Sequence, residues 1–159
     1  GTTFRVTFTL PTAEEGSVRR DEMQEPVRLP ARGVNVLVAE DNALNYEIVV
    51  EQLSSYGLHC RRAKDGRDCV RQFERSQPGE IDVILMDMQM PEMNGLEATA
   101  AIRALARPDA KEIPIIALTA NAYQEDVQRC LDAGMNAHLS KPIHVDRAVR
   151  TIAECLKKK

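Results

Sequence analysis

The sequence predicts an α/β fold, a doubly wound five-stranded parallel sheet with helices on both of its faces. Two observations carry this prediction. From residue 34 onward, short and almost entirely apolar runs alternate with longer segments whose apolar side chains recur at helical spacing. Glycine, proline or polar turn residues separate each run from its neighbours. Strands that are buried on both faces and alternate with helices are typical of parallel sheets.

The first 32 residues precede this alternation. Residues 1–11 alternate strictly between apolar and polar side chains, which predicts a half-buried strand. Residues 12–32 are charged, interrupted by proline and poor in apolar side chains, so we interpret them as a linker. The strand is therefore expected to belong to a preceding domain. Without its parent sheet, it should be disordered or pair with a sheet edge.

The first two units of the sheet begin at residue 34. Val34–Ala39 is nearly all apolar, as a strand covered on both faces would be. A helix is expected over Asn42–Tyr56, because the glycine that follows can end it as a C-terminal cap. Leu58–Ala63 has a weaker apolar pattern and is expected at an edge. A second helix is expected over Asp65–Ser76, where a proline and a glycine follow.

The other three units repeat this plan. Their strands are expected at Ile81–Met86, Ile113–Leu118 and Ala137–Ser140, and their helices at Leu96–Leu105, Ala122–Ala133 and Val145–Leu156. The last helix carries its apolar residues on one face. Right-handed crossovers place ligands at the carboxyl ends of parallel strands, so functional residues are expected immediately after the strong strands.

The composition narrows the class of protein. A length of 159 residues suits one domain with a tail, and a net charge of −3 argues against a nucleic-acid surface. The sequence has neither a signal peptide nor an apolar run approaching the roughly 18 residues that span a membrane. Its four cysteines form no CxxC pair and no zinc-spaced cluster with histidine. We expect a cytoplasmic domain, whether or not a longer parent chain is anchored in a membrane.

Three carboxylates are predicted to meet at the carboxyl edge of the sheet. Glu40 and Asp41 follow the first strand, and Asp87 follows the third. Like charges at close range need a proton or a cation between them. Carboxylate oxygens without Cys or His nearby suit Mg²⁺ or Mn²⁺. Alternatively, Glu40 and Asp41 merely begin the next helix, where acidic side chains are favoured.

An ammonium group and a hydroxyl are predicted at the same edge. Pro142 holds Lys141 in an extended backbone and permits a cis bond in a tight turn. Lys141 is either a solvated charge or a partner of Asp87 at rest and of a phosphoryl oxygen afterwards. Thr119 suits the site and the N-cap of the next helix equally. Together these groups favour phosphoryl transfer, with Asp87 as the nucleophile that forms an acyl phosphate.

Four stretches closely resemble the response-regulator receiver domain, a CheY-like fold. They are VLVAEDN at 36–42, DVILMDMQMPEMNGLEA at 82–98, PIIALTANA at 114–122 and AGMNAHLSKPI at 133–143. The resemblance extends over residues 33–157 and implies a flavodoxin-like sheet of order 2-1-3-4-5. It implies that a phosphohistidine partner phosphorylates Asp87. It also implies that Asp41, Asp87 and the backbone carbonyl of Gln89 ligate Mg²⁺ directly, and that Glu40 does so mostly through water.

The resemblance further implies a switch. Thr119 moves toward the bound phosphoryl group, and an aromatic side chain three positions before the lysine turns inward. His138 stands at that position in place of the usual Tyr or Phe. A histidine that only half covers the sheet edge is the alternative to a signalling role. The expected partner surface is the face formed by the fourth helix, the fifth strand and the fifth helix.

The opening residues GTTFRVTFTLP resemble the closing strand of a histidine-kinase ATPase domain. A receiver that follows such a strand suggests a hybrid sensor histidine kinase. The expected partners are a kinase dimerisation domain or a histidine phosphotransfer domain, with no nucleic acid and no membrane contact by this part of the chain. ATP-binding motifs are absent from the sequence. Whether the chain counts as an enzyme therefore stays open. The resemblance implies that it catalyses its own phosphoryl transfer, followed by relay and slow hydrolysis, and that the parent kinase is a transferase.

Two other classes with related folds or chemistry fit the sequence poorly. An FMN-binding flavodoxin needs a Ser/Thr/Gly phosphate loop after the first strand, where Glu40 and Asp41 would repel a phosphate. A phosphatase of the haloacid dehalogenase class needs a second Asp two positions after its nucleophile, where this chain has Gln89. A pseudo-receiver, acting as a non-phosphorylated docking module, stays open as the alternative, although the retained carboxylates and Lys141 argue against it.

Overall fold

A computed structural model describes residues 27, 29–30, 33–120 and 123–158. The strand predicted for residues 1–11 and most of the linker predicted for 12–32 lie outside this part of the chain. The described residues form a five-stranded sheet of order β2-β1-β3-β4-β5, with every neighbouring pair parallel. The predicted doubly wound α/β fold is confirmed, together with the strand order that the family resemblance implied.

The strands lie close to their predicted positions. They are β1 (Val34–Ala39), β2 (Leu58–Ala63), β3 (Val83–Asp87), β4 (Ile115–Thr119) and β5 (Ala137–Ser140). The third and fourth strands each begin two residues later and end one residue later than predicted. Ile81 and Ile113 are buried although they precede the strands, so apolarity alone extended the prediction too far.

Polar side chains cap three of the α-helices at their N-termini. The described residues form five α-helices. They are α1 (Ala43–Ser54), α2 (Gly66–Arg75), α3 (Gly95–Ala104), α4 (Gln124–Asp132) and α5 (Val145–Lys157), with a short 3₁₀ helix, η1 (Pro108–Ala110), that was not predicted. Asn42 caps α1 by accepting hydrogen bonds from the N–H groups of Leu44 and Asn45. Asn94 and Glu97 form a capping box on α3, which therefore starts one residue earlier than predicted.

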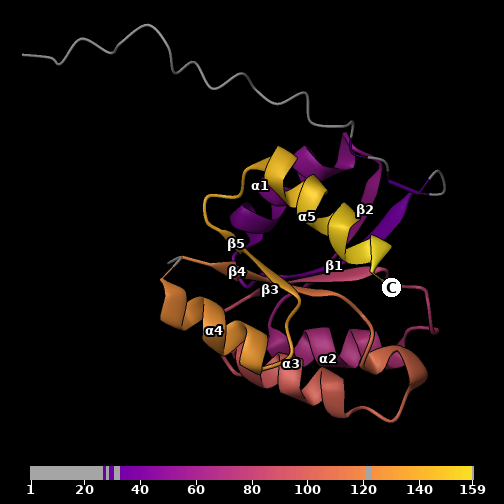
Figure 1. The fold of residues 1–159 in the computed structure, drawn as a ribbon, viewed down its shortest axis with the longest axis vertical. Helices are drawn as coiled ribbons and strands as arrows, with labels where there is room; N and C mark the ends of the chain where they lie inside the picture. Colours follow the sequence, from indigo (N-terminus) through magenta and orange to yellow (C-terminus); the bar gives the residue numbers. More distant parts are fainter. Residues whose placement is uncertain (1–26, 28, 31–32, 121–122, 159) are drawn as a thin grey trace, which may run out of the picture.

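The helices cover both faces of the sheet. Figure 1 shows α1 and α5 on one side and α2, α3 and α4 on the other. Along β1, Val36 and Val38 pack in the core cluster shared with α1 and α5, whereas Leu37 packs in the cluster shared with α2 and α3. Alternate side chains of a strand point to opposite faces, so a central strand must be apolar throughout.

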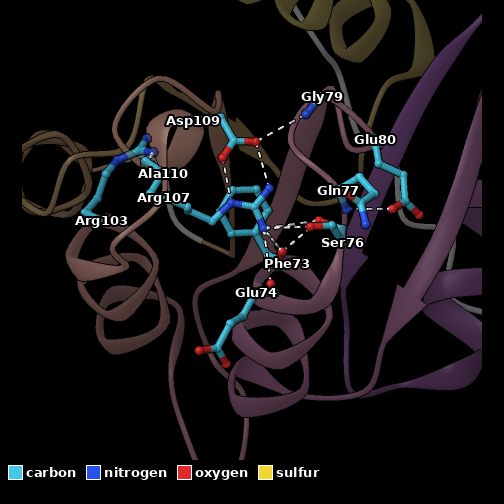
Figure 2. Close-up of polar contacts among 10 residues, drawn as sticks. All are labelled: Phe73, Glu74, Ser76, Gln77, Gly79, Glu80, Arg103, Arg107, Asp109 and Ala110. Atoms are coloured by element: carbon cyan, nitrogen blue, oxygen red, sulfur yellow. Dashed lines mark hydrogen bonds and ion pairs between the residues drawn. The ribbon is translucent and has the colours of Figure 1, made fainter.

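An arginine links the loops at the amino edge of the sheet (Figure 2). This edge lies opposite the predicted site. The guanidinium of Arg107 lies 4.1 Å from the ring centroid of Phe73 and donates hydrogen bonds to the carbonyl oxygens of Phe73 and Ser76. It also forms a two-armed ion pair with Asp109, at 2.6 and 2.8 Å. These bonds tie the C-terminal end of α2 to the loop that follows α3.

The described helices are also short and amphipathic. Across residues 33–120 and 123–158, none combines the length and the apolar content that crossing a membrane requires.

Candidate functional site

Three carboxylates meet at the carboxyl edge of the sheet, as the sequence predicts. Because β1 and β3 are parallel neighbours with Ala39 opposite Met86, Glu40 and Asp87 emerge side by side. One carboxylate oxygen from each of Glu40, Asp41 and Asp87 lies within 4.8 Å of the other two. Glu40 and Asp87 are buried, at 2% and 6% exposure, while Asp41 is exposed. We refer to these three residues as the acidic cluster.

Lys141 reaches the acidic cluster from the end of β5. Its Nζ donates to Asp87 Oδ2 and to Glu40 Oε2, both at 2.7 Å. The predicted pairing with Asp87 is therefore present, and the second bond to Glu40 was not anticipated. The backbone N–H of Lys141 donates to the carbonyl oxygen of Thr119 at 2.8 Å, and the bond to Pro142 is cis. The lysine is thus part of the site and not a solvated surface charge.

Glu40 is held by more groups than the sequence suggested. Its Oε1 accepts hydrogen bonds from the N–H of Asn42 and from Nδ2 of Asn45, each at 3.2 Å. Burial raises the pKa of Glu40, but hydrogen bonds from Lys141 and Asn45 outweigh it, and the net pKa lies below the usual value. Glu40 is therefore a fixed carboxylate. The two asparagines that follow the acidic pair were the available sequence signal for this arrangement.

Asp87 is oriented from two sides. Its Oδ1 accepts the N–H of Gln89 at 3.1 Å, and its Oδ2 accepts Lys141. Burial raises the pKa of Asp87 above the usual value, against the lowering effect of Lys141 and Gln89. Burial acts in the other direction on Lys141, but hydrogen bonds with Asp87 and Glu40 raise its pKa overall, so the ammonium stays charged.

The charges of the site are unbalanced. When the acidic cluster is ionised, the ammonium of Lys141 bonds to two of its three carboxylates, those of Glu40 and Asp87. The three carboxylates and this ammonium together carry a net charge of −2, and the donor atoms are all hard oxygens. A small divalent cation such as Mg²⁺ fits this charge and this donor set.

Thr119 ends β4 beside the acidic cluster. It is buried, at 6% exposure, and lines a pocket of about 590 Å³ together with Asp41, Met88 and Ala120. The alternative role as the N-cap of α4 is wrong, because Tyr123 occupies the N-cap position. The helix begins later than predicted, at Gln124, and Thr119 is the last residue of β4.

Two other predicted residues lie at different depths. Gln89 is exposed, and its backbone N–H is directed at Asp87. Ligation by its carbonyl oxygen stays a prediction. His138 is half-buried on β5 and lines a groove with Gln124, Val127 and Gln128 at α4, so it lies against that helix and not in the acidic cluster. Its part in a switch also stays a prediction.

The fold and this edge together define a class of protein. The chain matches the family model of the response regulator receiver domain over residues 36–153, and it belongs to that family. It is 34% identical over 144 residues to the sensor histidine kinase RcsC of Salmonella typhi, covering 91% of this chain and 13% of that protein. It is 39% identical over 116 residues to the peroxide stress-activated histidine kinase mak1 of Schizosaccharomyces pombe, covering 72% of this chain and 7% of that protein. The chain thus spans a small part of these relatives.

Two solved structures extend the comparison. The receiver domain of the sensor histidine kinase PA1611 from Pseudomonas aeruginosa PAO1, with a magnesium ion coordinated in its active site cleft, is 38% identical with a TM-score of 0.70. The match covers 79% of this chain and 98% of that one. The co-crystal of the Saccharomyces cerevisiae phosphotransfer protein Ypd1 with the receiver domain of Ssk1 gives 29% identity and a TM-score of 0.67, over 77% of this chain and 88% of that one.

Proposed function

We propose that this receiver domain accepts a phosphoryl group from a phosphohistidine on Asp87 and relays it to a histidine phosphotransfer domain. The observation that carries the proposal is the position of Asp87: a buried carboxylate, 2.7 Å from the ammonium of Lys141, inside a cluster with excess negative charge. Positioning and charge neutralisation are what phosphoryl transfer needs from a protein.

The chain's own groups divide the work. An oxygen of Asp87 attacks the phosphorus, the P–O bond forms, and the P–N bond to the donor imidazole breaks, returning its electron pair to the ring. Lys141 moves from Asp87 to a phosphoryl oxygen, and Thr119 donates its hydroxyl to another. The N–H of Gln89 holds the second carboxylate oxygen in place. Slow hydrolysis of the acyl phosphate ends the signal.

The acidic cluster would hold the cation. Asp41, Asp87 and the backbone carbonyl of Gln89 would bind Mg²⁺ directly, and Glu40 mostly through water, with Mn²⁺ as a substitute. When bound, the cation neutralises the excess negative charge so that a phosphoryl group can approach. The magnesium ion in the cleft of the PA1611 receiver supports this assignment.

A protein is the donor that best fits the surface beside the site. Leu44 and Ile48 are 63% and 47% exposed, one helical turn apart on α1. The same helix begins at the acidic cluster, so a partner that packs on these side chains can bring its histidine to Asp87. The partnership of Ypd1 with the Ssk1 receiver supports a histidine phosphotransfer domain as this partner, and a kinase dimerisation domain would present the same chemistry. The face formed by α4, β5 and α5 is proposed as the surface that reads the switch.

A hybrid histidine kinase is the proposed parent chain. The alignment with RcsC covers 91% of this chain and therefore reaches into the residues before 33. This supports a segment before the receiver that the two proteins share, and we propose residues 1–11 as the closing strand of an ATPase domain and residues 12–32 as its linker to the receiver. A cytoplasmic position of the domain follows from the same proposal.

The decisive experiment is phosphorylation by a small donor. With Mg²⁺ and acetyl phosphate, the intact mass should rise by one phosphoryl group, and the increase should vanish with EDTA and in Asp87→Asn. Beryllofluoride should give the matching ¹⁹F signals under the same conditions. A chain without a Mg²⁺-dependent adduct would instead be the non-phosphorylated docking module, and an adduct that persists in Asp87→Asn would place the acceptor elsewhere.

A further inference from the structure

We propose that Arg62 is a positioning residue that fixes the acidic cluster for cation binding, an inference that rests on the proposed function. Arg62 is the penultimate residue of β2. Its Nε donates to the carbonyl oxygen of Glu40 at 3.2 Å, and its Nη2 donates to the carbonyl oxygen of Asp41 at 2.6 Å. One guanidinium thus holds the backbone of two residues that carry two of the three carboxylates.

The guanidinium is itself held in place. Arg62 lies opposite Val38 in the ladder between β1 and β2. Its guanidinium lies 5.7 Å from the ring centroid of Tyr46 on α1, and the hydroxyl of Tyr46 donates to the carbonyl oxygen of Cys60 at 3.3 Å. The carbonyl oxygen of Arg62 accepts Nε2 of Gln72 at 2.8 Å. The guanidinium of Arg62 is therefore already restrained, so it loses little conformational entropy when it donates hydrogen bonds to the turn.

The turn needs such support at Asp41. The N–H of Glu40 still bonds to the carbonyl oxygen of Ala63, at 3.1 Å, so Glu40 follows the sheet. Asp41 has left the sheet, precedes the cap of α1 and is exposed. Mg²⁺ demands nearly ideal octahedral geometry, and mutation of groups that orient metal ligands typically lowers metal affinity by about 10–100-fold. The Arg62 bond to the Asp41 carbonyl supplies this orientation.

Charge and orientation act in opposite directions here. The positive charge of Arg62 near the acidic cluster should weaken cation binding, whereas the fixed turn should strengthen it. The side chain is half-buried and open to screening by water and salt, while its two hydrogen bonds, at 3.2 and 2.6 Å, are directional and local. We therefore expect orientation to dominate.

Two variants separate these effects. Arg62→Lys keeps the positive charge but loses the planar guanidinium that donates both hydrogen bonds. Arg62→Gln loses the charge and the guanidinium. Arg61→Gln is the matched control, because the neighbouring arginine pairs with Glu80 at 2.9 Å. Among the described residues, no hydrogen bond or ion pair joins Arg61 to the acidic cluster. Mg²⁺ titration without a phosphodonor, followed by amide NMR shifts, measures affinity directly. Phosphorylation by acetyl phosphate then gives the Mg²⁺ dependence of the rate.

Both Arg62 variants should weaken Mg²⁺ affinity by roughly tenfold, with Arg61→Gln unchanged. The phosphorylation rate at saturating Mg²⁺ should stay near that of the wild type, so the loss appears in the half-saturating Mg²⁺ concentration. Tighter binding in Arg62→Gln with unchanged binding in Arg62→Lys would mean that charge dominates and would overturn the inference. Lower thermal stability with unchanged Mg²⁺ affinity would reduce Arg62 to a structural residue. A wild-type chain that binds no Mg²⁺ would overturn the proposed cation site and this inference with it.

Discussion

Replacing Lys141 with Met should leave two buried carboxylates without their shared counter-charge. Lys141→Met keeps most of the aliphatic stem and removes the ammonium that lies 2.7 Å from both Asp87 and Glu40. Removing one partner of a buried ion pair typically costs about 3–5 kcal/mol. The Lys141 side chain is 27% exposed, and Asp87 can take up a proton as relief, so we expect a smaller loss. The free energy of unfolding should fall by about 2–3 kcal/mol.

The assay is denaturant unfolding in EDTA and in saturating Mg²⁺. At about 3–5 °C per kcal/mol for a domain of this size, the loss in EDTA corresponds to a melting temperature lower by roughly 10 °C. A cation that binds the folded state stabilises it by mass action, and in the variant it no longer competes with an ammonium. Mg²⁺ should therefore recover more stability in Lys141→Met than in the wild type.

The control variant is Lys111→Met. Lys111 is exposed and follows η1, before β4 begins, whereas the acidic cluster lies where the strands end. It should change the free energy of unfolding by less than about 0.5 kcal/mol in either buffer. A Lys141→Met protein as stable as the wild type in EDTA would refute the reasoning. The same holds if Mg²⁺ stabilises the variant less than it stabilises the wild type.

Three further outcomes are expected. Replacing Leu44 and Ile48 together with Ala should slow phosphotransfer from a histidine phosphotransfer domain by about tenfold, without slowing phosphorylation by acetyl phosphate. Arg107→Met should lower the free energy of unfolding by roughly 2–3 kcal/mol in urea titrations, because several charged hydrogen bonds are lost; an unchanged midpoint would contradict this. The hydrogen bond from Arg107 holds the pKa of Asp109 below its usual value, so this carboxylate stabilises the fold above about pH 4, and the contribution fades as the pH falls through the lowered pKa. The stability difference between the wild type and Asp109→Asn should thus be smaller at about pH 3 than at about pH 7, and equal differences at both would count against the pairing.

The sequence predicted the arrangement of the site better than its contacts. Strand ends in a parallel sheet share an edge, and this alone brought Asp87, Glu40 and Lys141 together. The second bond of Lys141, to Glu40, depends on the side-chain path over β3, which spacing along the chain does not encode. Arg62 was missed for the same reason, since it bonds to main-chain oxygens of the turn that follows the neighbouring strand β1.

The boundaries of the elements show a related limit. Ile81 and Ile113 read as strand residues because they are apolar, yet they bury their side chains before the ladder begins. The short helix η1 was not predicted, and the residue before it, Arg107, is held by tertiary hydrogen bonds to Phe73 and Ser76 that the local sequence does not show. Alternation of strands and helices predicts a parallel sheet, whereas the strand order came from the resemblance to the family.

The hydrogen bonds of Arg107 make the amino edge of the sheet different from its carboxyl edge. At the amino edge, Arg107 donates its hydrogen bonds to main-chain carbonyl oxygens and to Asp109, all within the chain. The carboxyl edge carries excess negative charge, which a cation can balance. We therefore expect that loops at the carboxyl edge can be exchanged between homologous domains without disturbing the amino edge. Chimeras of that kind should keep the unfolding behaviour of the parent that supplies the amino edge.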